Sequence, residues 1–442
     1  MGGRRTWTCC LALLAFGLLF REARAQQQQM SKFDRARTEE MLKIVASDVS
    51  KHYYDRDFHG VDWDAKVQEA REKIDRETSL GMALSHIAAA LDSLNDSHTF
   101  FVPPQRPVRA RYGWEFQMIG DHCFVTQVQP GSDAETKGLK PGDEVLAING
   151  YTPTRQNLWK MQFVFRILRP QPALKLALRD PAGQERQVEV MTKFRQDQRL
   201  KDLTGNGIWD LVRSAENEQH FMRVRMREVG DDLLVVKLPE FLLTHQEVDD
   251  LIHKANKRQL LIIDLRGNPG GAVESLEFLV GGMLDHEIKI ADQVERDKTK
   301  PLNAKSIGGG AFKGKLAVLV DSRSASAAEL FARTVQLEKR GVVLGDQSSG
   351  SVMESREYSY KVGDDVVVFF GASITAADLV MTDGKSLEHR GVTPDQIVLP
   401  SAADLAAGRD PALSQAAAAL GVKLSAEEAG KLFPYEWPPD TD

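Results

Sequence analysis

A serine-rich stretch, "DSRSASAAELF" (321–331), contains the residues of this chain best suited to nucleophilic chemistry. It follows the apolar run "KLAVLVD" and has helical spacing, so the sequence predicts a strand that turns sharply into a helix. A serine hydroxyl at such a turn lies beside backbone N–H groups that the helix itself does not use. Ser322, Ser324 and Ser326 are therefore candidate nucleophiles, and the alternative for Ser326 is a purely structural helix N-cap.

Other segments carry groups that such a nucleophile needs. In "IIDLRGNPGGAVES" (262–275) an apolar strand runs into glycines that permit close backbone approach and could present N–H groups to an oxyanion. "LNDSHTFFVPP" (94–104) contains a histidine, and "DGKSLEHRGVTPDQIVL" (383–399) contains acidic residues. An imidazole is a suitable base near pH 7, and a carboxylate can orient it.

The whole chain has the composition of an ordinary folded protein. It has 442 residues, of which 42% are hydrophobic and 27% charged, with a formal net charge of −6. That charge argues against a nucleic-acid partner, and nothing in the sequence selects an oligomeric state. The ten histidines show no spacing typical of a metal site, so no metal is predicted.

The first 25 residues have the pattern of a secretory signal peptide. A basic start, "MGGRR", precedes an apolar run, and small residues follow at Ala23 and Ala25. We expect cleavage near Ala25 and an exported protein, periplasmic or secreted, with no stable membrane span after cleavage. The alternative is an uncleaved anchor. Only Cys123 lies beyond this segment, so no internal disulfide is expected.

The elements that position these groups change character along the chain. Helical spacing comes first, then strands with Pro-Gly and Asn-Gly turns, then a polar stretch, then apolar strands that alternate with helices, and finally a helix. The predicted fold class is α/β, in the following segments: signal peptide 1–25, N-terminal helical region 26–105, β-rich domain with helices 106–195, linker or lid 196–230, α/β domain 231–400 and C-terminal helical tail 401–442.

The second segment resembles a known binding domain. "VQPGSDAETKGLKPGDEVLAINGYTP" (128–153) is similar to a PDZ domain of the bacterial protease type. The resemblance implies that an extended peptide binds along a sheet edge, with its terminal carboxylate in backbone N–H groups. The carboxylate-binding loop would be "YGWEFQMIG" (112–120), including Tyr112, Gly113, Trp114, Glu115 and Phe116. In the alternative interpretation the domain binds no peptide and only stabilises the neighbouring domain by packing against it.

With this PDZ domain between them, the helical and α/β segments resemble the C-terminal processing peptidases, or tail-specific proteases, and their tricorn-type relatives. The resemblance implies a ClpP/crotonase-like catalytic domain in which Ser326 is the nucleophile. The amide of Ala327 and one from Gly270 or Gly271 would bind the oxyanion. Its partners would be polypeptide substrates or C-terminal tails, and acyl-enzyme formation would need no cofactor.

The chain departs from the processing peptidases at the base. Those enzymes pair the serine with a lysine in an "FGKG"-like loop, but "GDQSSGSVME" (345–354) has Ser351 at that position. Leu337 also stands where an acidic residue often accompanies the lysine. A serine without a base is a weak nucleophile, so a Ser–Lys dyad is not expected.

The tricorn-type pattern supplies a different base. It implies His98 as general base, with Ser97 and Glu388 as supports. The alternatives are a structural histidine, as in lysine-type members with a "PHS" motif, and Lys385 as the base. The leading interpretation is an exported serine endopeptidase acting on unfolded or C-terminally exposed polypeptides, whose ends the PDZ domain presents. The alternative is a catalytically silent homologue that binds peptides or proteins.

Overall fold

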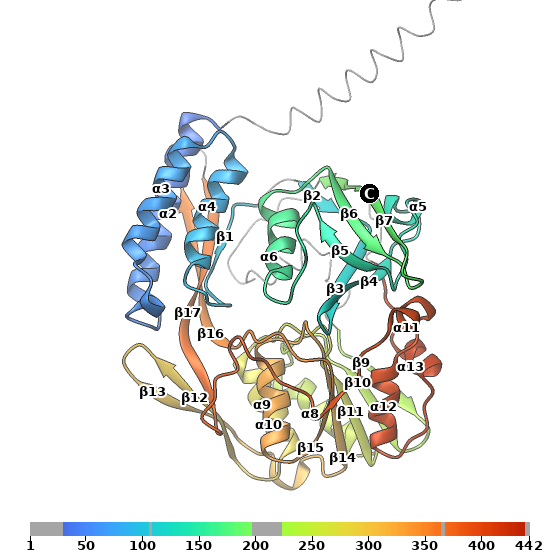
Figure 1. The fold of residues 1–442 in the computed structure, drawn as a ribbon. Helices are drawn as coiled ribbons and strands as arrows, with labels where there is room; N and C mark the ends of the chain where they lie inside the picture. Colours follow the sequence, from blue (N-terminus) through green and yellow to red (C-terminus); the bar gives the residue numbers. More distant parts are fainter. Residues whose placement is uncertain (1–29, 106–107, 197–222, 364–366, 438–442) are drawn as a thin grey trace, which may run out of the picture.

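The structure is a computed structural model that describes residues 30–105, 108–196, 223–363 and 367–437 (Figure 1). The predicted signal peptide and most of the predicted linker lie outside these residues. None of the helices in the described ranges is long and apolar enough to span a bilayer.

The N-terminal region is a group of helices that covers an antiparallel sheet, as the 3.6-residue spacing predicts. Ser31 caps the first helix with Asp34, and one apolar face of each helix is buried in a common core with Phe101 and Phe370 of the sheet. The helices are α2 (Lys32–His52), η1 (Phe58–Gly60), α3 (Trp63–Arg76) and α4 (Leu80–Asp92).

The strands of that sheet come from both halves of the chain. Only its first strand follows the helices directly in the sequence, and the other four come from residues 288–381. Its strands are β1 (Phe100–Val102), β12 (Ile288–Glu295), β13 (Thr299–Ala304), β16 (Met353–Val362) and β17 (Val368–Met381). The pairing of Phe101 with Ala372 ties the segment just after His98 to β17. The sequence analysis identified no strand between residues 288 and 304 or between 353 and 381.

The PDZ region forms a separate five-stranded antiparallel sheet in the order β3-β4-β5-β6-β7, so β3 is an edge strand. Its elements are β3 (Trp114–Ile119), β4 (His122–Val128), α5 (Asp133–Thr136), β5 (Glu144–Ile148), α6 (Leu158–Phe163) with a π-helical turn η2 (Val164–Leu168), β6 (Ala173–Arg179) and β7 (Glu185–Met191). A two-stranded ribbon, β2 (Val108–Arg111) and β8 (Lys193–Gln196), connects this domain to its neighbours.

The central sheet of the α/β domain is parallel except for one edge strand, in the order β18-β15-β14-β11-β10-β9. Its elements are β9 (Arg225–Val229), β10 (Leu233–Lys237), α8 (His245–Ala255), β11 (Leu260–Asp264), α9 (Val273–Met283), η4 (Gly308–Gly310), β14 (Lys315–Val320), α10 (Ala327–Leu337), β15 (Gly341–Gly345) and β18 (Gln396–Ile397). Residues 225–229, which the sequence analysis placed in the linker, are therefore part of this sheet, because β9 pairs with β10 along its length.

Both faces of the central sheet are buried, which explains its near-continuous apolar strands. Alternate residues such as Val236 and Ile263 contact α8, α9 and α10 on one face. Their neighbours, such as Val235 and Ile262, contact the C-terminal helices on the other face.

The C-terminal tail contains three short helices where the sequence analysis expected one. They are α11 (Ala402–Ala407), α12 (Pro411–Ala419) and α13 (Ala426–Leu432). The first ends because Gly408 adopts a left-handed conformation (φ 64°), and Asp410 then caps the next helix ahead of Pro411.

The PDZ domain lies over the carboxyl ends of the central strands, beside the N-terminal helices (Figure 1). Arg155 donates to both oxygens of Asp346 at 2.7 Å, just after β15. The Gln117 amide donates to Asp321 at 2.7 Å, just after β14. The end of β3 is thereby attached to the loop that leads into Ser326.

Candidate active site

Ser326 lies at the sharp strand-to-helix turn that the sequence predicts. Its backbone has φ 54° and ψ −119°, a conformation uncommon for a residue with a side chain, and α10 begins at the next residue. The Ser324 hydroxyl is buried and donates to the Leu265 carbonyl at 2.8 Å, and the Ser322 hydroxyl donates to the Met118 carbonyl. Both neighbouring serines therefore have structural hydrogen bonds, which favours Ser326 as the nucleophile.

The glycine loop packs directly against this turn. A Cβ atom added to Gly270 would lie 2.6 Å from Ser326 Cβ and 3.1 Å from Ala327 N. The Gly270 amide donates to the Asn268 side chain at 2.8 Å and so has an acceptor. The amides of Gly271 and Ala327 have no acceptor among the described residues. Gly271 and Ala327 are therefore the better pair of candidate oxyanion donors.

Because of this packing, Gly270→Ala tests whether activity depends on the close contact between the glycine loop and Ser326. Because its φ of 104° and the 2.6 Å contact both exclude a side chain, we expect a loss of roughly 10²-fold or more in kcat and about 1–3 kcal/mol in the free energy of unfolding. Gly267→Ala is the matched control, since it shares a positive φ of 75° but its Cβ would meet nothing within 4 Å. Equal kcat values for the two variants would contradict the assignment.

His98 is the end of a hydrogen-bonded chain that begins at Glu388. Ser97 Oγ donates to Glu388 Oε2 at 2.9 Å and lies 2.8 Å from His98 Nδ1. Since the hydroxyl proton points to the carboxylate, the imidazole donates its Nδ1 proton to Ser97 Oγ. Nε2, which has no partner among the described residues, is then left with its lone pair and can act as a base.

The surroundings of His98 favour the neutral form of its imidazole ring. His98 is only 5% exposed, and burial lowers its pKa from 6.5 to about 4, against an opposing effect of the nearby Asp96. Above about pH 4 the ring is therefore neutral. Burial also raises the pKa of Glu388, while hydrogen bonds from Val352 N and Ser97 favour its ionised form.

Asp96, which the sequence analysis did not single out, holds the His98 segment in place. Its Oδ1 accepts hydrogen bonds from the backbone amides of His98 at 2.8 Å and Thr99 at 3.0 Å. It also accepts one from the Thr375 hydroxyl at 2.6 Å, which attaches the segment to β17. An aspartate whose side chain bonds the backbone two residues further on is a common turn feature, but the partner of Asp96 on β17 is not visible in the sequence.

The turn at residues 324–327, called the nucleophile turn below, and the hydrogen-bonded chain Glu388–Ser97–His98 both bond to one short segment, residues 351–352. The Ser326 amide donates to the Ser351 carbonyl at 2.8 Å, and the adjacent Val352 amide donates to Glu388 Oε2 at 2.8 Å. Ser351, at the position of the missing lysine, shares a hydrogen bond with Ser349 at 2.8 Å. Lys385, the alternative base, is exposed on the surface, as are Lys339 and Lys361.

The predicted peptide-binding residues mostly build the PDZ core. Trp114 and Phe116 are buried and stack at 4.6 Å, and the buried Tyr112 donates to the Phe165 carbonyl at 2.8 Å. Glu115 forms an ion pair with Arg166 at 3.2 Å. These residues can therefore contribute backbone groups to a bound peptide, together with Gly113, whose φ is 74°.

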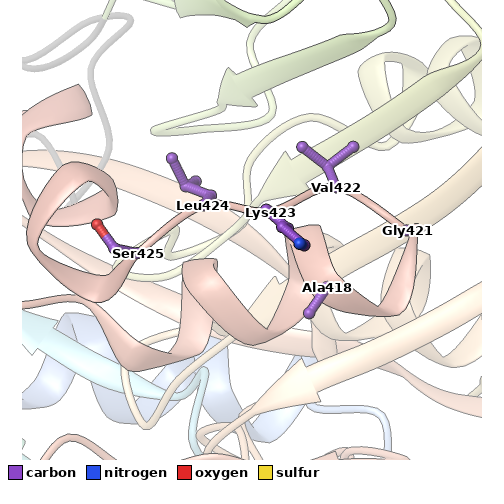
Figure 2. A pocket seen from close by; sticks show the side chains of 6 residues that line it. All are labelled: Ala418, Gly421, Val422, Lys423, Leu424 and Ser425. Atoms are coloured by element: carbon purple, nitrogen blue, oxygen red, sulfur yellow. The ribbon is translucent and has the colours of Figure 1, made fainter.

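A cavity of about 570 Å³ lies between the PDZ domain, the central strands and the C-terminal helices. Its lining includes Ala325, the residue before Ser326, and Ser349, whose amide donates to the Ser324 carbonyl at 2.9 Å. A second hollow of about 440 Å³ follows α12 and is lined by Ala418 and residues 421–425 (Figure 2). Over the described ranges, no cluster of histidine, cysteine or acidic residues is suited to a metal ion.

Comparison with known proteins agrees with this geometry. Residues 232–398 match the model of peptidase family S41, and residues 104–177 match that of the PDZ domain. The chain thus contains a serine-type peptidase domain that matches family S41 beside a PDZ domain, and the predicted family resemblance and α/β fold class are confirmed.

Two curated relatives illustrate the class. The tail-specific protease of Haemophilus influenzae is 24% identical over 64% of this chain and 39% of that protein. Carboxyl-terminal-processing peptidase 3, chloroplastic, of Arabidopsis thaliana is 23% identical over 78% of this chain and 66% of that protein. The chain spans less than two thirds of the length of each.

Two solved structures share the fold. Mature CPAF complexed with lactacystin superposes with a TM-score of 0.62 at 14% identity, over 85% of this chain and 96% of that one. The photosystem II D1 C-terminal processing protease does so with a TM-score of 0.50 at 18% identity, over 82% and 93%.

Proposed function

We propose that this protein is an exported serine endopeptidase that cleaves unfolded or C-terminally exposed polypeptides through an acyl-enzyme. The observation that carries the proposal is the Glu388–Ser97–His98 chain, which meets the Ser326 turn at residues 351–352. That arrangement provides a base where the lysine of the processing peptidases is missing.

In the first half-reaction, Ser326 Oγ attacks the scissile carbonyl carbon while His98 Nε2 takes the hydroxyl proton. The carbonyl oxygen becomes an oxyanion that the amides of Gly271 and Ala327 stabilise. When the C–N bond breaks, the imidazolium gives its proton to the departing amine. Water then attacks the acyl-enzyme by the same route, with His98 again as base, and Ser326 is regenerated.

The proposed role of the PDZ domain is to lead a substrate C-terminus to this site. β3 is an edge strand and can accept an extended peptide by main-chain hydrogen bonds. Its end contacts the loop before Ser326 through Gln117 and Met118. The names of the two relatives, tail-specific protease and carboxyl-terminal-processing peptidase, favour substrates with a free C-terminus. We infer export from residues 1–25, with cleavage near Ala25.

A direct test compares one unfolded polypeptide in two forms, with a free C-terminal carboxylate and with a C-terminal amide. The protein from residue 26 onward should cleave both, with a lower kcat/KM for the amide because the PDZ loop loses a charged partner. A serine-directed phosphonate should label Ser326. Binding of the peptide without cleavage or labelling would instead support the silent peptide binder, which the absent lysine favours.

Ser97→Ala tests the histidine chain. Removal of the hydroxyl leaves the Nδ1 proton of His98 without its acceptor. Neither the tautomer nor the orientation of the ring is then fixed by a hydrogen bond. We expect kcat to fall roughly 10- to 100-fold with KM little changed, as single-turnover kinetics would show. Ser85→Ala, which removes a hydroxyl bonded only within helix α4, should leave kcat unchanged. A purely structural His98 predicts no difference between the two variants.

A further inference from the structure

A fully buried carboxylate, Glu329, lies beneath the nucleophile turn and is absent from the mechanism above. Its exposed fraction is 0%. Oε1 accepts hydrogen bonds from Ser348 Oγ at 2.5 Å and from the Gly350 amide at 2.8 Å. Oε2 accepts from the amides of Ser351 at 3.0 Å and Ser326 at 3.1 Å. One side chain thus holds the nucleophile and the loop that faces it.

This arrangement goes beyond ordinary helix capping. Glu329 is the third residue of α10, and an acidic residue at this position commonly bonds only the N-cap amide. Glu247 of α8 is such a case: it bonds Thr244 and is exposed. Glu329 has three additional partners, all in the loop 348–351.

The same loop continues to the support of the base. The Gly350 carbonyl accepts from the His389 amide at 2.8 Å, and Ser348 Oγ accepts from the Val392 amide at 2.5 Å. Both bonds are made by residues that follow Glu388 in the sequence, and Glu388 itself accepts from the Val352 amide. A displacement of the loop would therefore move Ser326 relative to the Glu388–Ser97–His98 chain.

We propose that Glu329 is a positioning residue that holds the Ser326 turn and the Glu388 loop in register, and that it does so in its ionised form. The inference rests on the proposed function. Three of its four partners are backbone N–H groups, which can only donate. Ser348 alone could reverse its hydrogen bond. A proton on Oε1 opposes the Gly350 amide and a proton on Oε2 opposes the Ser351 amide, so either one weakens a hydrogen bond that the loop requires, whereas the Ser326 amide keeps the Ser351 carbonyl as a second acceptor.

The ionisation of Glu329 falls in an accessible pH range. Burial raises its pKa from 4.5 to about 7, although all four hydrogen bonds favour the charged form. Activity should therefore rise as pH increases through about 7, whereas His98 loses its proton already near pH 4. The free energy of unfolding should fall over the same pH range. Burial favours the neutral carboxyl in the folded state, and this contribution to stability is lost as pH rises through about 7.

Other titratable groups on the elements around Glu329 have partners of their own or are exposed. Those elements are α10, the loops 346–352 and 388–392, and the elements packed against α10, which are α9, β14 and β15. Glu274 of α9 and Lys315 of β14 are exposed, and the half-buried Glu277 of α9 lies near Glu274 and Lys305. Asp346 pairs with Arg155, Arg333 with Asp383, and Glu388 with Ser97. His389 and Arg390 are exposed. Burial is the largest influence on the pKa of Glu329, and the groups that oppose it are its four neutral hydrogen-bond donors.

Glu329→Gln tests the inference, because it keeps the shape and removes the ionisation. With the unfolded polypeptide substrate, we expect kcat at pH 8 to fall roughly 10- to 100-fold with KM little changed. We also expect the acid limb near pH 7 in the parent to disappear. Glu247→Gln is the matched control: it removes an acid at the same helix position and should leave both kcat and the acid limb unchanged.

A folded Glu329→Gln protein with the kcat and pH profile of the parent would overturn the inference. If that variant does not fold, Ser348→Ala takes its place. Loss of a hydrogen bond to the charged form should raise the pKa of Glu329 and move the acid limb to higher pH, so a limb that stays in place also overturns it. A parent that neither cleaves nor reacts with a phosphonate would instead contradict the proposed function.

Discussion

Ser326→Ala is expected to lower the cleavage rate roughly 10⁴-fold or more, because the proposed acyl-enzyme forms on the Ser326 hydroxyl. Peptide binding by the PDZ domain should remain, since β3 lies outside the turn. Measurements of kcat and of peptide affinity on the same preparation separate the two effects. Ser359→Ala, at an exposed position on β16, is the matched control and should match the parent.

The alternative for Ser326 makes a different prediction. If its only role is to cap α10, the alanine variant should lose about 1 kcal/mol in the free energy of unfolding and keep its activity. Thermal unfolding measured beside kcat distinguishes the two readings. Retained cleavage would exclude Ser326 as the nucleophile.

His98→Gln should have the second largest effect, with a loss of roughly 10⁴-fold in kcat, because the serine hydroxyl loses its proton acceptor. In the parent, the lowered pKa of about 4 means that His98 stays neutral throughout the physiological range. The step in activity caused by His98 itself should therefore appear only near pH 4.

Lys385→Ala is the control for this prediction, since the lysine is exposed and its sequence neighbourhood made it the alternative base. It should retain the kcat of the parent. Activity that survives in His98→Gln but disappears in Lys385→Ala would remove His98 from the mechanism.

Local sequence patterns predicted the parts of the fold that depend on near neighbours. Apolar spacing located helices α2 to α4 and the buried strands β10, β11, β14 and β15. The strand β16, "MESREYSYKV", was missed because polar residues dominate it, and it is a strand because β17 pairs with it along its length. The C-terminal tail was predicted as one helix because the break at Gly408 was overlooked.

The residues of the candidate site also divide into those that local patterns predicted and those that only folding brings together. The serine-rich turn and the glycine loop were predicted because small residues in a turn after a strand are a local feature, and the family resemblance then selected Ser326, Gly270 and Gly271 within them. Ser97 and Glu388, separated by 291 positions, were paired only through a family resemblance, and the structure places them 2.9 Å apart. Glu329 and Asn268 gave no signal of their own, because buried polar side chains are rare and their partners lie on other segments.

The amino-acid sequence by itself thus determined the class of this protein, its order of domains and the serine at its nucleophile turn. These depend on motifs within some tens of residues. Only the tertiary structure decided which nitrogen of His98 is left without a proton, which glycine amide has no acceptor among the described residues, and how Glu329 connects the Ser326 turn to the loop 348–351. The physical reason is that hydrogen-bond partners and burial, which set tautomers and pKa values, come from distant segments that folding alone brings together.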